Sequence, residues 1–214
     1  MSDKIPEDRT RWWWVRHAPV VTSGGKIYGQ KDVPCDTSDT ASFEGLAAML
    51  PAGAVWVTSH LCRAIDTAAA IVTAGAASQP VLREPDFAEQ SFGHWQDHSW
   101  DDLQQENSVQ YQAFWESPGR NAPPGGESFA DLIARTDKAI KRLNTAHQGR
   151  DIVAVTHGGT IRAALAIALD VEPINALSLK IDNLSLTRLD HFGGGQFKGQ
   201  GSNWRIDGVN LPPV

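Results

Sequence analysis

The sequence predicts an α/β fold built on a largely parallel sheet. Short apolar runs alternate with stretches of helical periodicity along most of the chain, which is the pattern of parallel strands joined by helices. After Ala176 the pattern changes to β segments without helices between them, which predicts an antiparallel addition to the sheet. With 214 residues, 41% of them hydrophobic and 21% charged, the chain suits one globular domain over residues 1–214.

The first third of the chain predicts two strands, each followed by a helix. The apolar run Trp12–Val15 predicts the first strand, and the glycine-rich polar stretch 20–34 predicts a loop. Apolar residues at helical spacing predict a helix that Pro51 ends: Phe43, Leu46, Ala47 and Leu50. A second strand is predicted over 54–57, and helical spacing then returns: Leu61, Ile65, Ala68 and Val72.

The middle of the chain is predicted to be irregular over 84–96 and then mainly helical. One helix is predicted over 99–115 and a longer one after a loop rich in proline and glycine over 121–126. Both begin with the residue pattern of a helix N-cap: Ser99-x-x-Asp102 and Ser128-x-x-Asp131. The longer helix has inward-facing residues at helical spacing: Phe129, Leu132, Ile133, Thr136, Ile140 and Leu143.

The last third begins with another strand and helix and ends in β structure. The continuously apolar run 151–156 predicts a strand that is buried on both faces. Gly158 and Gly159 end it, and a helix follows with Ile161, Leu165 and Leu169 on one side. The later β segments are predicted on both sides of a glycine turn at 193–195: 177–181, 184–189 and 204–206.

Charge and cysteine content exclude several classes of partner. A net charge of −6 provides no general attraction for nucleic acid or for an anionic membrane, so we expect neither as a partner. Cys35 and Cys62 have no zinc-type spacing and form no disulfide framework. The charged start of the chain does not resemble a secretory signal, and no apolar run is long enough to span a bilayer. We therefore expect a soluble, cytoplasmic protein.

Basic residues follow three of the predicted strands. Arg16 and His17 follow the first, Arg63 lies one helical turn after the second, and His157 follows the strand over 151–156. Because ligands of open parallel sheets bind outside the carboxyl ends of the strands, these side chains are predicted to share one crevice. The helix that starts near Gly158 adds free N–H groups to the same place. An acidic protein with such a local cluster is expected to bind an anion there.

Four motifs resemble those of the histidine phosphatase superfamily, also called phosphoglycerate mutase-like. The family's Arg-His-Gly corresponds to Arg16-His17-Ala18, and its glutamate before Phe-Gly-x-Trp corresponds to Glu89. Its Ser-x-Leu-x-Arg-Ala-x-x-Thr-Ala motif begins here at Ser59, and its His-Gly-Gly-x-Ile-Arg motif begins at His157. The resemblance spans the chain and implies a three-layer α/β/α sandwich with a mostly parallel central sheet.

The resemblance also implies roles for these residues. His17 is expected to be the nucleophile and Glu89 the proton donor, while Arg16, Arg63 and His157 bind the phosphoryl group. Imidazole can attack phosphorus and form a phosphohistidine, so this scheme needs neither a metal nor another cofactor. Further substrate contacts are expected from four residues: Ser23, Gln30, Ser59 and Gly158. The chain departs from the family at Ala18-Pro19-Val20, where Gly-Glu-Thr is usual, so fewer side chains are expected to hold phosphate.

Several functions remain open at this point. The run from Glu89 to Gly93 fits the phosphatase branch better than the Arg-x-Tyr-Gly of cofactor-dependent mutases. We predict a hydrolase for a small phosphate ester, with α-ribazole 5′-phosphate as one candidate substrate. The alternatives are a phosphoglycerate mutase-type transfer and a non-catalytic phosphoryl-binding or phosphoprotein-binding module. The oligomeric state stays open, with a homodimer among the options.

Four side chains near Glu89 carry weaker signals. His94 and His98 have the spacing of helical metal ligands, but no third ligand is evident and a helix is not predicted there, so we expect no metal site. Phe92 and Trp95 are candidates for the leaving-group pocket, with a structural role as the equal alternative.

Overall fold

A computed structural model describes residues 9–21, 24–77, 80–193 and 203–213. Its six-stranded sheet has the order β3-β2-β4-β1-β5-β6. The strands are β1 (Arg9–Arg16), β2 (Val55–Thr58), β3 (Val81–Arg83), β4 (Asp151–Thr156), β5 (Leu186–Phe192) and β6 (Trp204–Leu211). Neighbouring pairs among β3, β2, β4 and β1 are parallel, while β5 is antiparallel to both β1 and β6. The mostly parallel sheet with an antiparallel end is therefore confirmed.

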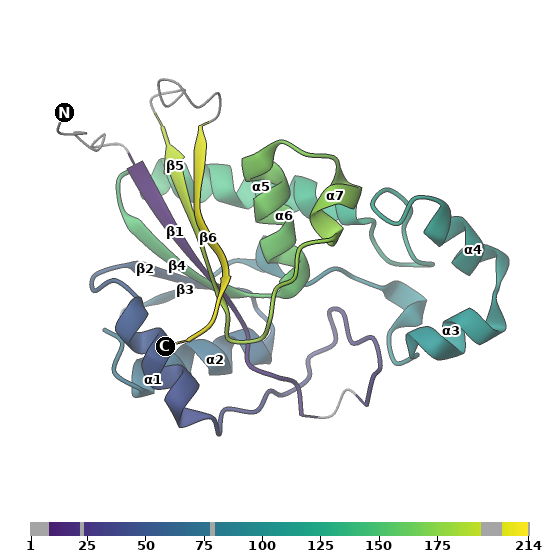
Figure 1. The fold of residues 1–214 in the computed structure, drawn as a ribbon, viewed down its shortest axis with the longest axis horizontal. Helices are drawn as coiled ribbons and strands as arrows, with labels where there is room; N and C mark the ends of the chain where they lie inside the picture. Colours follow the sequence, from purple (N-terminus) through teal and green to yellow (C-terminus); the bar gives the residue numbers. More distant parts are fainter. Residues whose placement is uncertain (1–8, 22–23, 78–79, 194–202, 214) are drawn as a thin grey trace.

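Helices cover both faces of the sheet, which confirms the three-layer arrangement (Figure 1). One face carries α1 (Thr40–Met49) and α2 (Cys62–Thr73), and the other carries α5 (Phe129–Ala146), α6 (Gly158–Leu169) and α7 (Pro173–Leu177). Alternate residues of the central strands point to opposite layers. Ile152 packs in the cluster that includes α5 and α6, and Val153 packs with α1 and α2. Burial on both faces explains the continuous apolar run of β4.

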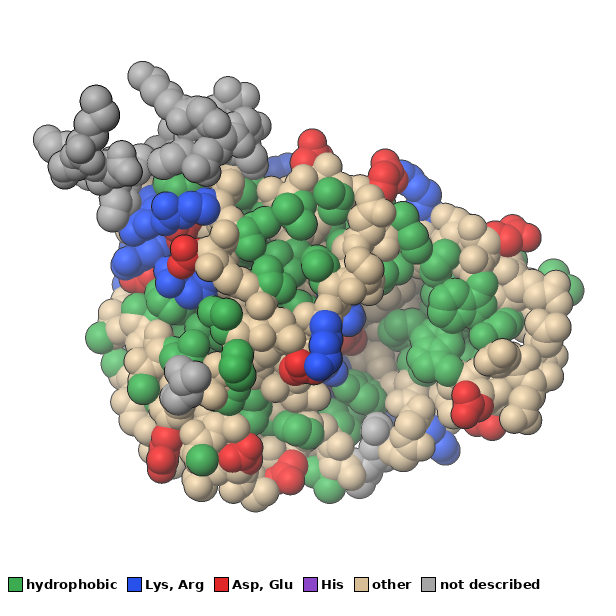
Figure 2. Space-filling view, viewed as in Figure 1, with side chains coloured by type: hydrophobic (Ala, Val, Ile, Leu, Met, Phe, Trp, Pro, Cys, Tyr) green, Lys and Arg blue, Asp and Glu red, His purple; other side chains and the backbone are tan. Residues whose placement is uncertain are grey.

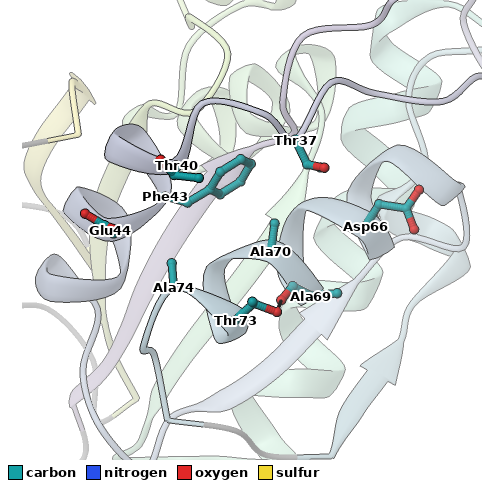
Figure 3. A pocket seen from close by; sticks show the side chains of 9 residues that line it. All are labelled: Thr37, Thr40, Phe43, Glu44, Asp66, Ala69, Ala70, Thr73 and Ala74. Atoms are coloured by element: carbon teal, nitrogen blue, oxygen red, sulfur yellow. Dashed lines mark hydrogen bonds between the residues drawn. The ribbon is translucent and has the colours of Figure 1, made fainter.

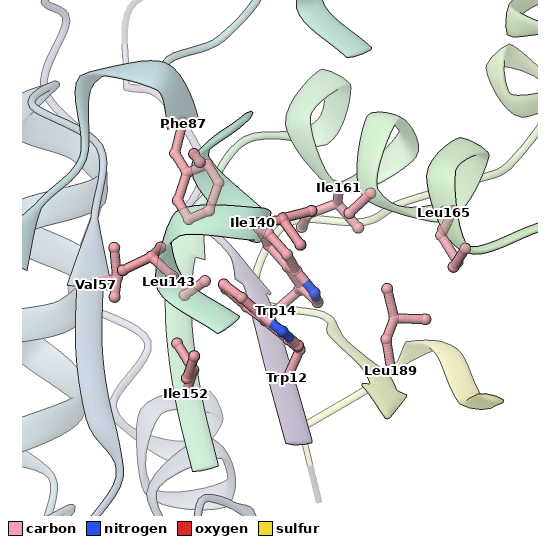
Figure 4. Packing of buried hydrophobic residues seen from close by; sticks show 14 of the residues in the cluster. Trp12, Trp14, Val57, Phe87, Ile140, Leu143, Ile152, Ile161, Leu165 and Leu189 are labelled. Carbon is pink, nitrogen blue, oxygen red and sulfur yellow. The ribbon is translucent and has the colours of Figure 1, made fainter. Parts of the chain in front are cut away.

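Aromatic packing against β1 anchors the segment that carries Glu89. Trp12 and Trp14 stack at 4.8 Å, and the ring of Phe87 meets Trp14 edge-on at 5.1 Å (Figure 4). The Thr156 hydroxyl donates a hydrogen bond to the Phe87 carbonyl at 2.7 Å, and Thr160 donates to it at 3.2 Å. Phe87 ends the short 3-10 helix η1 (Pro85–Phe87). The tryptophans of β1 thus fix the chain two residues before Glu89.

The helix predicted over 99–115 is two helices, so that prediction was wrong. The chain forms α3 (Trp100–Glu106) and α4 (Val109–Glu116), with the predicted Ser99 capping box present at the start of α3. Asn107 ends α3 in a left-handed conformation (φ 43°), which asparagine tolerates better than most residues. Ser108 then caps α4, because its hydroxyl accepts from the Tyr111 N–H at 3.2 Å.

These two helices form a side arm with its own small core. Trp95, in the 3-10 helix η2 (Gly93–Trp95), packs with Ile27, Leu103 and Phe114. Partly buried Phe92, Trp100 and Tyr111 border this cluster. Figure 1 shows the arm projecting away from the sheet on the side of its carboxyl ends. Trp95 is therefore a structural residue of the arm.

The C-terminal β predictions were partly right. The segments 184–189 and 204–206 correspond to β5 and β6, which are longer than predicted. The strand predicted over 177–181 is absent, because α7 occupies the chain up to Leu177 with Pro173 at a position that suits a helix start. The turn predicted at 193–195 lies, beyond Gly193, outside the described residues. The short β3 was not predicted, since its three exposed residues form an edge strand with no apolar pattern.

Within the described residues, no helix combines the length and the apolar character that crossing a bilayer requires.

The Ser128 cap provides a test of the long helix. The Ser128 hydroxyl accepts from the Asp131 N–H at 3.1 Å, and the Asp131 carboxylate accepts from the Ser128 N–H at 3.0 Å. We expect Ser128→Ala to lower the free energy of unfolding in urea by about 1 kcal/mol, because a first-turn N–H loses its acceptor. The Ser128→Thr variant keeps the hydroxyl and should retain most of the stability. Equal values for Ser128→Ala and the wild type would contradict the cap.

Candidate active site

The pairing of β1 with β4 brings two histidines together. Arg16 lies opposite Thr156 in the parallel register, so both strands end at the same level of the sheet. The His17 N–H donates to the Thr156 carbonyl at 2.9 Å, and the rings of His17 and His157 lie 5.1 Å apart between centroids. Both side chains are fully buried. The two histidines that the sequence places after separate strands thus lie side by side.

Hydrogen bonding sets the tautomer of His17. Its Nδ1 lies 2.7 Å from the Ala18 carbonyl oxygen, which can only accept, so Nδ1 carries the proton. Nε2 then presents its lone pair, and it has no hydrogen-bond partner among the described residues. Burial, together with repulsion from the nearby Arg63 and Arg16 guanidinium groups, lowers the pKa of His17 to about 3. His17 is therefore neutral at physiological pH, as a nucleophile must be.

Main-chain carbonyls hold the two arginines beside His17. Arg63, from the first turn of α2, donates to the Gly29 carbonyl at 2.6 Å and the Lys31 carbonyl at 2.7 Å. Arg16 donates to the Ile181 carbonyl at 2.6 Å. Each guanidinium keeps a buried Nε–H without a partner in the described part of the chain. Fixed, incompletely paired guanidinium groups are suited to bind an anion.

Ser59 positions His157. The Ser59 hydroxyl and His157 Nε2 lie 2.8 Å apart, while His157 Nδ1 has no partner among the described residues. Burial holds the pKa of His157 well below its usual value, with repulsion from His17 and Arg63 acting in the same direction. The structure thus places Ser59, predicted as a substrate contact, against the second histidine.

Glu89 lies over the start of α6. Its carboxylate accepts hydrogen bonds from the Gly159 N–H at 3.1 and 3.3 Å and from the Gln90 N–H at 2.9 Å. A Cβ at position 159 would lie 2.2 Å from Glu89 Oε1, so any larger residue there would displace the Glu89 carboxylate. Gly158 lies next to Arg16, where a Cβ would stand 3.4 Å from Arg16 Nε. The glycine pair therefore joins the carboxylate to the guanidinium cluster.

The segment that carries Glu89 is held by an ion pair that the sequence did not reveal. Glu127 and Arg135 pair at 2.7 Å, and Arg135 also donates to the main-chain carbonyls of Asp86 at 2.6 Å and Glu89 at 2.9 Å. The Gln30 amide donates to the same Glu89 carbonyl at 2.9 Å. Gln30, predicted to contact substrate, is thus placed to support Glu89. Glu127 and Arg135 lie on a loop and a helix, and no spacing pattern links them to the site.

Asn183 is a second site residue missed by the sequence analysis. Its amide donates to the His17 carbonyl at 2.7 Å, and the next residue, Leu184, donates through its N–H to the Arg16 carbonyl at 3.0 Å. The loop before β5 therefore braces the turn at the end of β1. A single asparagine between predicted β segments carries no signal for this contact. Ser23, the remaining predicted contact, lies outside the described residues.

A cavity of about 210 Å³ is lined by Glu89 and Tyr28, and the Tyr28 ring lies 6.4 Å from the His17 ring between centroids. Lys26, Phe92 and Trp100 line the same cavity. A larger cavity of about 540 Å³ lies elsewhere, between α1 and α2 (Figure 3). It is lined by Thr37, Thr40, Phe43, Glu44, Asp66, Ala69, Ala70, Thr73 and Ala74, none of which belongs to the histidine cluster. The chemistry of its side chains, rather than its size, identifies the site.

In the part of the chain that the structure describes, no group of three or more His, Cys, Asp or Glu side chains is arranged to hold a metal ion. His94 lies in η2 and His98 beyond its end, so the two do not share an α-helical face.

Comparison with known proteins agrees with this arrangement. An Arabidopsis thaliana metal-independent phosphoserine phosphatase is 30% identical over 168 residues, covering 75% of this chain and 69% of that protein. A Salmonella typhimurium adenosylcobalamin/alpha-ribazole phosphatase is 25% identical over 185 residues, covering 84% and 90%. A mycobacterial glucosyl-3-phosphoglycerate phosphatase structure has a TM-score of 0.79 at 25% identity, with 95% and 99% coverage.

One relative is considerably longer. The chain covers 51% of a bifunctional protein of Mycobacterium tuberculosis, to which it is 29% identical over 190 residues. The histidine phosphatase superfamily (branch 1) model matches residues 12–204, a range that contains all four motifs and both histidines. The chain therefore belongs to the histidine phosphatase superfamily and is an enzyme of that family.

Proposed function

We propose that the protein is a phosphomonoesterase that works through a phosphohistidine on His17. The observation that carries this proposal is the state of the His17 ring: buried, neutral, protonated on Nδ1 and with a free Nε2 lone pair between two fixed guanidinium groups. Neutral imidazole is the form that attacks phosphorus, and neighbouring cations stabilise charge on the phosphoryl oxygens. A structural histidine would have no need of this combination.

In the first step, His17 Nε2 attacks phosphorus while the bond to the leaving-group oxygen breaks. Arg16, Arg63 and the N–H of Gly158 hold the non-bridging oxygens in the transition state. The dianionic substrate favours the protonated form of His157, whose Nδ1–H then donates to a phosphoryl oxygen. Protonated Glu89 delivers its proton to the departing alkoxide, which leaves as a neutral alcohol.

In the second step, the Glu89 carboxylate takes a proton from water, and the water oxygen attacks the phosphohistidine. The P–N bond breaks, inorganic phosphate forms, and the electron pair returns to His17 Nε2. Glu89 ends the cycle protonated, ready for the next substrate. The Gly159 and Gln90 N–H groups keep its carboxylate oriented through both steps.

The substrate is proposed to be a small phosphorylated metabolite, with α-ribazole 5′-phosphate as one candidate. The Salmonella typhimurium relative supports this candidate by its name, while the other two relatives are named for phosphoserine and glucosyl-3-phosphoglycerate. A panel of these three esters, assayed without added metal, identifies the preferred leaving group. Turnover that depends on added 2,3-bisphosphoglycerate would instead favour phosphoryl transfer of the mutase type.

Removing the nucleophile tests the proposal directly. We expect His17→Ala to reduce kcat on the order of 10³-fold or more, because the covalent route is lost. The wild type incubated with ³²P-labelled substrate should yield a labelled protein that is labile to acid and stable to alkali, and the variant should not. His147→Ala is the matched control, since His147 caps the far end of α5. Equal activity of His17→Ala and wild type would refute the mechanism.

The lowered pKa of His17 predicts how stability depends on pH. The pKa is about 3 in the folded protein and 6.5 for a free imidazole, so between these values the unfolded chain binds the extra proton. Stability contributed by neutral His17 is therefore present above pH 6.5 and is lost as pH falls toward 3.

The measurement is urea unfolding at pH 7 and pH 5. We expect His17→Gln to lose less unfolding free energy than the wild type over this interval, by about 2 kcal/mol. Glutamine does not titrate, and it leaves His157 in place as a shared background. Parallel losses in the two proteins would show that His17 is not held neutral.

Substitution of Gly159 is expected to affect activity more than stability. In Gly159→Ala the new Cβ displaces the Glu89 carboxylate, so we expect kcat to fall by about 10²-fold or more. Alanine favours a helix over glycine by about 1 kcal/mol, so thermal stability should not fall in proportion. Gly158→Ala, whose Cβ meets Arg16 at ordinary contact distance, is expected to lose less activity. Equal losses in the two variants would contradict the role given to Glu89.

A further inference from the structure

An apolar groove adjoins the active-site cavity. It has a volume of about 310 Å³ and lies between the side arm and α7. Its apolar lining comes from six main side chains: Phe92, Trp100, Phe114, Trp115, Ile174 and Leu177. No charged side chain lines it, and Gln90 is its polar contributor. A pocket of this size and character suits a ring-sized apolar group.

The groove shares two lining side chains with the cavity that Glu89 lines. Phe92 and Trp100 line both the groove and the cavity that contains Glu89, and their rings meet edge-on at 5.9 Å. Gln90 directly follows Glu89, and its amide is held by the Glu127 carbonyl at 2.9 Å. Because Glu89 protonates the leaving-group oxygen in the proposed mechanism, the body of the leaving group extends from Glu89 past these two rings.

The outer part of the groove leaves large apolar side chains in water. Trp115 is 49% exposed and Ile174 is 50% exposed. Figure 2 shows hydrophobic side chains gathered over the side arm, beside a hollow that separates the arm from the rest of the molecule. Trp115 packs on Trp100 at 5.6 Å and on Phe114 at 5.3 Å, so its ring is part of an ordered aromatic wall. A ligand that covers this wall gains the free energy of removing it from water.

We infer that this groove is the leaving-group subsite and that it selects phosphate monoesters of uncharged, apolar alcohols, above all those with an aromatic ring. The inference rests on the proposed function and names its substrate class. Lys26 lines the other cavity and the lining of the groove holds no cation, so a second anionic group on the substrate finds no partner in the groove. Offset and edge-to-face contacts with Trp100 and Trp115 favour an aromatic body over an aliphatic one.

Paired substrates and a matched charge substitution test the subsite. For 1-naphthyl phosphate, we expect Ile174→Asp to lower kcat/KM about tenfold, equivalent to about 1.4 kcal/mol, mainly through KM. For glycerol 1-phosphate the same variant should stay within about twofold of the wild type, because this substrate does not reach the groove. Trp115→Ala should show the same selective loss. Because Trp115 lies on α4, this result would show that the loss does not come from a local disturbance of α7. Val109→Asp is the control: Val109 lies on α4, is 77% exposed and does not line the groove.

The possible results distinguish the subsite from the catalytic proposal. Equal losses with both substrates, or no loss with either, overturn the groove as a specificity site. If the wild type hydrolyses no phosphomonoester, the proposed function fails, and binding of 1-naphthol measured by tryptophan fluorescence still tests the groove. Quenching in the wild type that Ile174→Asp abolishes then supports an apolar ligand there, and identical titrations overturn it.

Discussion

The parallel pairing of β1 with β4 is the interaction on which the site depends. The register that sets Arg16 opposite Thr156 makes both strands end together, and the next residue of each chain segment is a histidine. A shift of one residue would turn His17 to the opposite face of the sheet and separate the two rings. The stacked Trp12 and Trp14 help to hold that register from below, because both are fully buried against α5 and α6. The packing of the core thus positions the two histidines.

Burying several basic groups at one point imposes an electrostatic constraint on the fold. Two guanidinium groups and two imidazoles lie close together, and the lowered pKa values of both histidines keep their rings neutral. The arginines cannot do so, and their charge is met by carbonyl oxygens at Gly29, Lys31 and Ile181. Those carbonyls come from two loops far apart in sequence, so both loops must keep their conformation for the arginines to stay paired. In the mechanism we propose, binding of the substrate's phosphate group offsets the free energy that this arrangement costs.

The sequence predicts the site residues that follow strands, but it does not predict those that act through contacts between distant segments. His17, Arg63 and His157 follow strands whose apolar pattern is strong, so local periodicity places them at one edge of the sheet. Asn183, Glu127 and Arg135 act through contacts that join distant segments, and no local pattern encodes such a contact. The prediction of one continuous helix in the side arm was wrong for a related reason. The helical periodicity of 99–115 is real, but Asn107 and Ser108 together favour ending one helix and capping the next.

This break also links the arm to specificity. A continuous helix from Ser99 to Trp115 would run straight, whereas the left-handed Asn107 reverses the chain and lets α4 fold back on α3. Folding back is what sets Trp115 against Trp100 and forms the aromatic wall of the groove. In the mechanism we propose, the phosphoryl-binding groups lie at the carboxyl ends of the strands, and the leaving-group contacts come largely from this arm. Substitutions in the arm can therefore change which alcohol is accepted without disturbing the strand ends that hold His17 and His157.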